Sequence, residues 1–397
     1  MQPVSPRQIF LALLAGGAAL VVVHALGRFA FTPLLPHLLG DQLLSLEQGA
    51  HLASWNYLGY LLGALLALAL YTPSRLRLAL PLALLLNALL TLAQGFCSDY
   101  PLLLGLRLAN GISNGVVFVL APALVLEWLA QRQRASLSGL VYLGFAAGLM
   151  LAGWLADAPA NWLHGPERWW PVAAFALPLA LLSAWLLSRL HLQQPQGEPV
   201  AARSRLFDRA STPLFLAYAG AGLGYILPMT FLPTLAQEQL PAGHALIGGA
   251  WQWSALACVF SIPLWNALGV GFGDRRALLA TYLLQALGCA APLLYPGAAG
   301  VLLCALLVGG TFMGSVLLTQ RLARTLQPHQ GPRLSAALIA LYGGAQLAGP
   351  WLAGVWLGAG GSLTESFALG VAALLWALAW IWPTPICTHP ASGAAHP

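Results

Sequence analysis

The chain has 397 residues, of which 59% are hydrophobic and only 7% are charged, and its mean hydropathy is +0.76. A soluble protein needs far more charged surface, so this composition excludes a soluble globular protein and indicates one that lies in a lipid bilayer. The formal net charge of +6 comes from 17 basic residues against 11 acidic ones, and every basic residue is an arginine.

Apolar stretches long enough to cross a membrane follow one another along the whole chain. A spanning helix needs about 20 mainly apolar residues, because the hydrocarbon core is about 30 Å thick. Twelve segments meet this requirement: 8–38, 47–71, 78–97, 101–129, 137–157, 169–190, 213–237, 245–268, 276–295, 299–322, 333–358 and 364–383. We therefore expect an all-α membrane protein with twelve transmembrane helices.

The arginines lie on one side of this predicted topology. The N-terminus and alternate loops carry Arg7, Arg75, Arg77, Arg132, Arg134, Arg189, Arg203, Arg205, Arg209, Arg275, Arg276, Arg321, Arg324 and Arg333. The opposite loops have one arginine, Arg168, beside acidic residues: Asp41, Glu47, Asp99, Asp157, Glu167, Glu238 and Glu365. The positive-inside rule predicts that both termini are cytoplasmic, which requires an even number of spans. No continuous basic face with interleaved aromatics occurs, so a nucleic-acid partner is not expected.

The two halves of the chain resemble each other. A polar segment at 191–212 separates six spans at 1–190 from six at 213–383, and a polar tail at 384–397 is expected to be disordered. A shift of 197 residues aligns "LGRFAFTPLLPHL" (26–38) with "LGYILPMTFLPTL" (223–235). Two parallel six-helix halves joined by a linker are a recurring transporter architecture, in which substrate binds near the midplane and the halves rock.

Particular motifs add a family resemblance. The segments "GRFAFTPLLPHL" (27–38), "SWNYLGYLLGALL" (54–66), "LRLANGISNGVVFV" (106–119) and "GYILPMTFLP" (224–233) resemble the major facilitator superfamily, and more narrowly its YbfB/YjiJ-type (MFS_4-like) branch of bacterial inner-membrane permeases. The resemblance implies a monomeric secondary transporter that works by alternating access in the bacterial inner membrane. Arg107 matches an arginine that many superfamily members carry in span four. The superfamily has a loop signature in which a Gly is followed by an Asp and basic residues. The loop between spans two and three, "TPSRLR" (72–77), lacks this Asp, whereas the equivalent loop between spans eight and nine, "GDRR" (273–276), keeps it.

Two arginines lie deep in predicted spans. Burial of an arginine near the bilayer centre costs about 2.5–3.5 kcal/mol on insertion scales, so Arg28 and Arg107 need partners, water or a function. We expect both at similar heights, roughly 30 Å along their spans. His24, Arg28 and Thr32 share a helical stripe, as do Arg107, Asn110 and Asn114, and both stripes are expected to face the interior.

No Asp or Glu lies deep in a predicted span, so the interior is expected to be electropositive and to attract a small organic anion. His24 is the candidate for proton coupling. The candidates for substrate binding are Arg28, Arg107, Thr32, Asn110 and Asn114, together with Asn56, Tyr57, Tyr225, Gln252 and Gln346. The candidates for a cytoplasmic gate are Asp274, Arg275 and Arg276. The structural alternative is that these side chains join helices, with Arg28 bonded to backbone carbonyls.

Other functions are less consistent with the sequence. The sequence has no GxSxG, no HExxH and no buried acid pair, so we expect no enzyme, and no cofactor or metal. Five cysteines lack CxxC spacing, which argues against a zinc site. The alternative hypothesis is that the protein exports neutral amphipathic compounds. Aromatic side chains would then line the pocket, and the arginines would be structural. The expected partners are a small-molecule substrate, the lipid bilayer and protons as a coupling ion.

Overall fold

The computed structural model describes residues 5–70, 73–158, 161–192, 208–209, 211–326 and 331–382. All regular secondary structure in these residues is helical. The elements in chain order are α1 (Pro6–Leu20), η1 (Val21–Phe29), α2 (Phe31–Gly40), α3 (Leu46–Leu70), α4 (Pro73–Gln94), α5 (Tyr100–Ala130), η2 (Ala135–Leu140), α6 (Val141–Asp157), η3 (Gly165–Trp169), α7 (Trp170–Ser188), α8 (Thr212–Gln239), α9 (Leu246–Phe272), α10 (Asp274–Leu294), α11 (Ala298–Leu326), α12 (Gly331–Gly358) and α13 (Leu363–Ile381).

These elements confirm the predicted all-α fold with twelve spans. The first span consists of α1, η1 and α2, and each later span has one main helix. Among the described residues, eight helical segments are long and apolar enough to cross a membrane, and two shorter apolar helices, Leu78–Gln94 and Val141–Asp157, accompany them. Most of the predicted linker 191–212 and the whole tail 384–397 lie outside the described residues.

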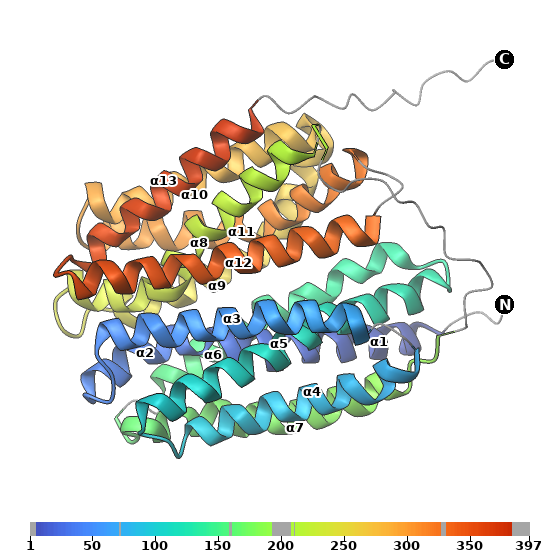
Figure 1. Ribbon diagram of the computed structural model, residues 1–397, viewed down its shortest axis with the longest axis horizontal. Helices are drawn as coiled ribbons and strands as arrows, with labels where there is room; N and C mark the ends of the chain where they lie inside the picture. Colours follow the sequence, from blue (N-terminus) through green and yellow to red (C-terminus); the bar gives the residue numbers. More distant parts are fainter. Residues whose placement is uncertain are drawn as a thin grey trace.

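The two halves form two bundles that pack side by side (Figure 1). Elements α1 to α7 make one bundle and α8 to α13 the other. The start of α1 and the end of α13 point toward the same end of the long axis (Figure 1), which we call the terminal end. The opposite end, where residues 41–45, 95–99 and 240–245 connect helices, is called the far end.

The first span, predicted at 8–38, is not a regular α-helix along its whole length. Its middle part, Val21–Phe29, is a π-helix, in which the Ala30 amide donates to the Ala25 carbonyl five residues earlier at 2.8 Å. The wider turn shifts the register of the following helix, whose Pro33 and Pro36 supply no amide hydrogen. Along this span, His24 contacts α5, Arg28 contacts α12 and Thr32 contacts α8.

Glycines bring α3 and α5 into backbone contact, as the GxxxG spacing predicts. A Cβ atom placed on Gly59 would lie 2.1 Å from the Leu108 carbonyl oxygen, and one on Gly111 would lie 2.1 Å from that of Asn56. In the C-terminal half, α9 and α11 make the same kind of contact through Gly309, whose Cβ would lie 2.3 Å from the Ser254 carbonyl oxygen. The neighbouring Gly310, the first glycine of the motif Gly310-x-x-x-Gly314, does not take part, because the nearest atom to its Cβ is 3.8 Å away. The close approach that GxxxG spacing favours therefore occurs at Gly59 and Gly111 but not at Gly310.

Among the described residues, the most extensive contacts between the halves are those of α3 with α12, α6 with α9, and α2 with α8. At the far end, α12 approaches α3 and α9 approaches α6 closely. A Cβ at Gly358 would lie 3.1 Å from the Glu47 carboxylate, and one at Gly248 would lie 2.3 Å from the Asp157 carboxylate. His37 binds the same Asp157 at 3.0 Å between Nε2 and Oδ1, so α2, α6 and α9 meet at this point.

Candidate substrate site between the two halves

Arg28 lies in the π-helical part of the first span and reaches across to the second half. Its side chain is 2% exposed. Nη2 donates a hydrogen bond to Oε1 of Gln346 on α12. The Gln346 amide Nε2 in turn donates to the Tyr225 hydroxyl on α8 at 2.6 Å. Gln346 therefore links Arg28 with Tyr225, the residue that the repeat places at the equivalent position.

Three aromatic rings surround the Arg28 guanidinium. Its central carbon lies 4.4 Å from the Tyr57 ring centroid, 4.6 Å from that of Tyr60 and 5.0 Å from that of Phe29. Such ring faces stabilise a buried cation without using its N–H groups. Nε and Nη1 accordingly have no hydrogen-bond partner in the described part of the chain.

Arg168 pairs with Asp41, whereas Arg28 and Arg107 have no acidic partner among the described residues. The buried polar residues among those described include His24, Arg28, Arg107 and Arg168, and no Asp or Glu. A buried cation is normally paired, because removal of an isolated charge from water costs several kcal/mol. The site around Arg28 therefore has a positive charge with donor groups still available.

Hydrogen bonds on both sides of Arg28 connect the halves. The Thr32 hydroxyl donates to the Met229 carbonyl at 2.7 Å, and these residues are 197 positions apart, the shift found in the sequence repeat. The Tyr57 hydroxyl and the Thr230 hydroxyl share a hydrogen bond of 2.8 Å. The repeated spans one and seven thus meet at equivalent residues, and Arg28 lies close to this pseudo-symmetric contact.

His24 lies one turn before Arg28, inside the N-terminal half. Its Nδ1 is 3.0 Å from Oδ1 of Asn114, so Nδ1 carries the hydrogen and the amide oxygen accepts it. Its ring stacks on Phe118 at 4.2 Å between centroids and also contacts Phe29, Tyr60 and Phe145. Asn114 and the aromatic rings therefore fix the orientation of the imidazole.

Arg107 has surroundings different from those of Arg28. Its Nη1 donates to the Gly27 carbonyl at 3.1 Å, and its guanidinium lies 4.7 Å from the Phe31 ring centroid and 5.9 Å from that of Trp169. The bond joins α5 to the π-helical segment of span one. Arg107 thus makes the kind of backbone contact that the sequence suggested as the alternative for Arg28.

Asn56 and Asn110 belong to a polar network within the N-terminal half. Asn56 Nδ2 donates to the Arg107 carbonyl at 3.0 Å. Asn110 Nδ2 donates to the Asn87 carbonyl at 3.2 Å and to the Thr91 hydroxyl at 3.1 Å. These bonds join α3, α4 and α5 to one another. Of the predicted substrate-binding residues, the structure therefore gathers Arg28, Thr32, Tyr57, Tyr225 and Gln346 between the halves and places Asn56, Arg107, Asn110 and Asn114 behind them.

The remaining predicted residues lie elsewhere. Gln252 Nε2 donates to the Met150 carbonyl at 3.2 Å, between α9 and α6. At the terminal end, Asp274 pairs with Arg321 of α11 at 3.0 Å, Arg275 donates to the Ile381 carbonyl of α13 at 3.3 Å, and Arg276 is exposed. The contacts of Asp274 and Arg275 join helices of the C-terminal half to one another.

Sequence reasoning missed two residues of the site. Tyr60 forms part of the ring cluster around Arg28, and its signal was its position one helical turn after Tyr57. Asn87 supports Asn110 from α4, where it is a lone amide in the apolar run "LALLLNALL" (82–90). A polar residue of this kind inside a span is expected to face other helices.

The architecture and the buried polar cluster between the halves define a membrane transporter rather than an enzyme. Solved transporters have the same fold. The nucleoside transporter NupG (D323A mutant) aligns with a TM-score of 0.71 and 13% identity over 93% of this chain and 98% of that one. A crystal structure of an auto-inhibited POT family peptide transporter aligns with a TM-score of 0.69 and 13% identity, over 94% and 96% of the two chains.

Sequence comparison gives the family. The family model described as "Uncharacterised MFS-type transporter YbfB" matches residues 20–381, so the chain belongs to this family of the major facilitator type. A curated relative, "Putative metabolite transport protein YaaU" of Escherichia coli (strain K12), is 25% identical over 243 residues, or 53% of this chain. The match spans 48% of that relative's length.

Proposed function

We propose that this transporter moves a small organic anion across the bacterial inner membrane by alternating access, driven by the proton gradient. The observation that carries the proposal is the buried Arg28 guanidinium, which has two nitrogens without a hydrogen-bond partner and no buried acid among the described residues. Guanidinium groups bind carboxylates and phosphates with paired hydrogen bonds, which favours an anionic substrate.

The neighbours of Arg28 have supporting roles in this proposal. Tyr57, Tyr60 and Phe29 hold the cation when no anion is bound, and Gln346 exchanges its bond to Arg28 for one to the substrate. Tyr225 holds Gln346 from the opposite half. Arg107 acts as a positioning residue, because its bond to Gly27 fixes the backbone next to Arg28.

Alternating access requires that one end of the molecule be closed while the other is open. Contacts at the far end join α3 with α12 and α6 with α9. Arg28 is buried at 2% exposure, so substrate reaches it only after the cluster opens. We infer that the far end is periplasmic and that both termini are cytoplasmic, since Arg7, Arg75, Arg132, Arg189 and Arg275 all lie at or near the terminal end.

His24 is the proposed proton-coupling group. Protonation of its Nε2 would place a second positive charge one turn from Arg28, in a low-dielectric interior. Binding of an anion at Arg28 offsets that charge, so anion and proton favour each other's binding. Coupling through His24 thus follows from the same electrostatics as anion binding. We propose that the transporter acts as a monomer.

The first test is ligand-induced thermal stabilisation of the detergent-purified protein. The panel contains small carboxylates, phosphates, neutral amphiphiles and cations, and each ligand is measured on the wild type, Arg28→Gln, Arg28→Lys and Arg75→Gln. The exposed Arg75, which donates to the Ala69 carbonyl, is the matched control for an Arg→Gln change. Particular anions should stabilise the wild type and Arg75→Gln but not Arg28→Gln, and Arg28→Lys should retain a fraction because it keeps the charge alone.

A different result would redirect the assignment. If neutral amphiphiles and anions stabilise the protein equally, and Arg28→Gln keeps both effects, the anion proposal fails and the arginine is structural. Uptake of a stabilising anion into proteoliposomes, with and without an imposed pH gradient, then tests coupling. His24→Gln should abolish the gradient dependence of uptake, and an unchanged dependence would exclude His24.

A further inference from the structure

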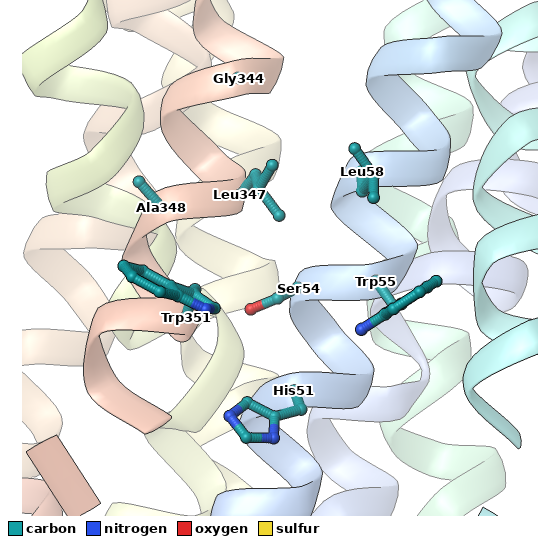
Figure 2. Close-up of a pocket in the computed structure, with 8 residues that line it drawn as sticks. All are labelled: His51, Ser54, Trp55, Leu58, Gly344, Leu347, Ala348 and Trp351. Carbon is teal, nitrogen blue, oxygen red and sulfur yellow. The ribbon is translucent and has the colours of Figure 1, made fainter. Parts of the chain in front are cut away.

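A cavity of about 520 Å³ lies between α3 of the first half and α12 of the second (Figure 2). One stripe of α3 and one stripe of α12 line it: His51, Ser54, Trp55, Leu58, Gly344, Leu347, Ala348 and Trp351. Its volume lies in the range of pockets that hold small molecules, about 300–1,000 Å³. It is separate from the Arg28 cluster, which uses the other faces of these two helices.

The cavity opens toward the lipid. On α3, Tyr57 and Tyr60 point to Arg28, whereas Trp55 on the opposite face is 40% exposed. On α12, Gln346 binds Arg28, whereas Trp351 is 53% exposed. Exposed side chains in the middle of a membrane-spanning helix face hydrocarbon, so an occupant of this cavity enters from the bilayer.

The polarity of the cavity changes along the membrane normal. His51 lies roughly 8 Å below the far end of α3, and Leu58 lies roughly 18 Å below it at 1.5 Å per residue. His51, Ser54 and the two tryptophans lie at the level nearer the far end, which is the lower part of Figure 2, whereas Leu58, Leu347 and Gly344 form the deeper, apolar level above them in the view. The gradient fits an amphipathic molecule whose polar part faces the far end.

Hydrogen-bonding groups lie at the level nearer the far end. The Ser54 hydroxyl and the indole nitrogen of Trp351 face the space between the helices, whereas the Trp55 ring lies on the other side of α3 in this view (Figure 2). Ser54 already donates to the Ala50 carbonyl at 3.0 Å, and the described residues supply neither indole N–H with an acceptor. The cavity therefore has polar groups toward the far end and an apolar channel deeper in the bilayer.

We propose that this cavity binds a membrane phospholipid, with one acyl chain between Leu58 and Leu347 and its polar part directed toward the far end. The lipid comes from the leaflet at the far end, and its assignment to the periplasmic leaflet rests on the topology proposed above. Because α3 and α12 belong to different halves, the bound chain contacts both and fills the space between them. Its binding does not depend on the anion site.

The test uses a phospholipid with a photoreactive diazirine in one acyl chain, reconstituted with the purified protein in vesicles. After illumination, mass spectrometry locates the labelled peptides. Segments 51–58 and 344–351 should carry several-fold more label than the exposed face of α7, which has Leu181 and Trp185 at its surface. Equal labelling of these surfaces would show ordinary annular lipid and overturn the proposal.

Filling variants make the result specific. A Cβ at Gly344 has only the Leu61 methyl within reach, at 3.8 Å, so Gly344→Leu places a side chain in the cavity and should abolish the excess label. Gly310→Leu is the control, since its Cβ has the same 3.8 Å clearance from Ala257 in another part of the second half. Ala348→Leu is the second filling variant if Gly344→Leu fails to fold.

Two outcomes would contradict the assignment. Retention of the excess label in both filling variants would show that the label does not enter the cavity. Displacement of the label by a neutral amphiphile that the protein also transports would make the cavity a substrate entrance instead of a lipid site. Loss of anion stabilisation in Arg28→Gln with unchanged lipid labelling would separate this proposal from the proposed function.

Discussion

The two halves of the molecule share a helical architecture but bury different side chains. The buried polar residues of the N-terminal half include His24, Arg28 and Arg107 together with four asparagines: Asn56, Asn87, Asn110 and Asn114. In the described part of the C-terminal half, the buried polar residues are hydroxyl side chains and two amides, Gln285 and Gln346. The first half therefore holds the charge, and the second supplies neutral partners for it.

The same difference recurs at corresponding places. Arg28 and Tyr225 occupy equivalent positions in spans one and seven. At the far end, Asp41 follows span one and binds Arg168 through two hydrogen bonds, of 2.5 and 2.8 Å. Gln239 ends span seven and makes a neutral version of this tie, with a 3.0 Å bond from its amide to the Thr364 hydroxyl. Each half therefore has a hydrogen-bonded contact just after its first span, charged in the N-terminal half and neutral in the C-terminal half.

The largest expected effect comes from a comparison of two glycines, one inside a close helix contact and one outside it. Gly111→Ala should lower the free energy of unfolding by about 3 kcal/mol, the upper part of the usual cost of overpacking, because its Cβ would lie 2.1 Å from a backbone carbonyl. Gly310→Ala should leave stability unchanged or raise it by up to about 1 kcal/mol, since alanine favours helix. Thermal unfolding in detergent, followed by tryptophan fluorescence, measures both. Equal destabilisation would mean that Gly310 also lies in a close helix contact.

The next effect should differ in sign between the third helices of the two halves. Asn87 Nδ2 donates to the Asn110 carbonyl and to the Ser113 hydroxyl, both at 3.0 Å, so Asn87→Leu should cost about 2 kcal/mol of stability. Gln285 is fully buried, and its amide nitrogen and oxygen have no partner in the described part of the chain. Gln285→Leu should therefore be neutral or stabilising.

The matched pair uses the same unfolding measurement at one detergent concentration. Asn87→Leu and Gln285→Leu both replace an amide by an aliphatic side chain, so the comparison cancels most of the change in hydrophobicity. Destabilisation of the protein by Gln285→Leu to the same degree as by Asn87→Leu would show that the second half also depends on a buried polar network.

The sequence predicted the fold well because hydropathy and the repeat are properties of the chain itself. Span length, the even number of spans and the 197-residue shift require no knowledge of side-chain contacts. The predicted position of Arg28 in the interior follows from the same reasoning, since a permanent charge does not face lipid. The contact of Thr32 with Met229 shows that the repeat also indicates where the halves meet.

The partners within the site were harder to predict because they depend on rotation of the helices. The π-helical turn at Val21–Phe29 has no clear sequence signal, and it separates the contacts of His24, Arg28 and Thr32. Arg107 was expected beside Arg28, but it bonds to the Gly27 backbone. Gln252 was expected near the substrate and instead bonds to Met150 between α6 and α9. Such details follow from how distant spans pack, which no local pattern specifies.

The smallest expected effect concerns two interactions at the far end, the Asp41–Arg168 ion pair and the Gln239–Thr364 hydrogen bond. The hydrogen bonds from Arg168 hold the pKa of Asp41 at about 2, well below its ordinary value of 3.8. An acid whose pKa is lower in the folded state stabilises the protein above its unfolded pKa, and this contribution is lost as the pH falls through the folded value. The wild type should therefore lose about 1 kcal/mol between pH 4 and pH 2, a modest amount because the pair is close to the surface.

The control variants separate this tie from general acid effects. Asp41→Asn should be less stable than the wild type at pH 7, and most of the difference between the two should disappear as the pH falls to about 2. Gln239→Ala removes the neutral tie of the second half, so its difference from the wild type should remain constant over the same range, since no titrating group is lost. Unfolding midpoints at several pH values provide the comparison. If the Asp41→Asn difference persists at pH 2, the ion pair does not contribute to stability, and the charged and neutral ties are equivalent.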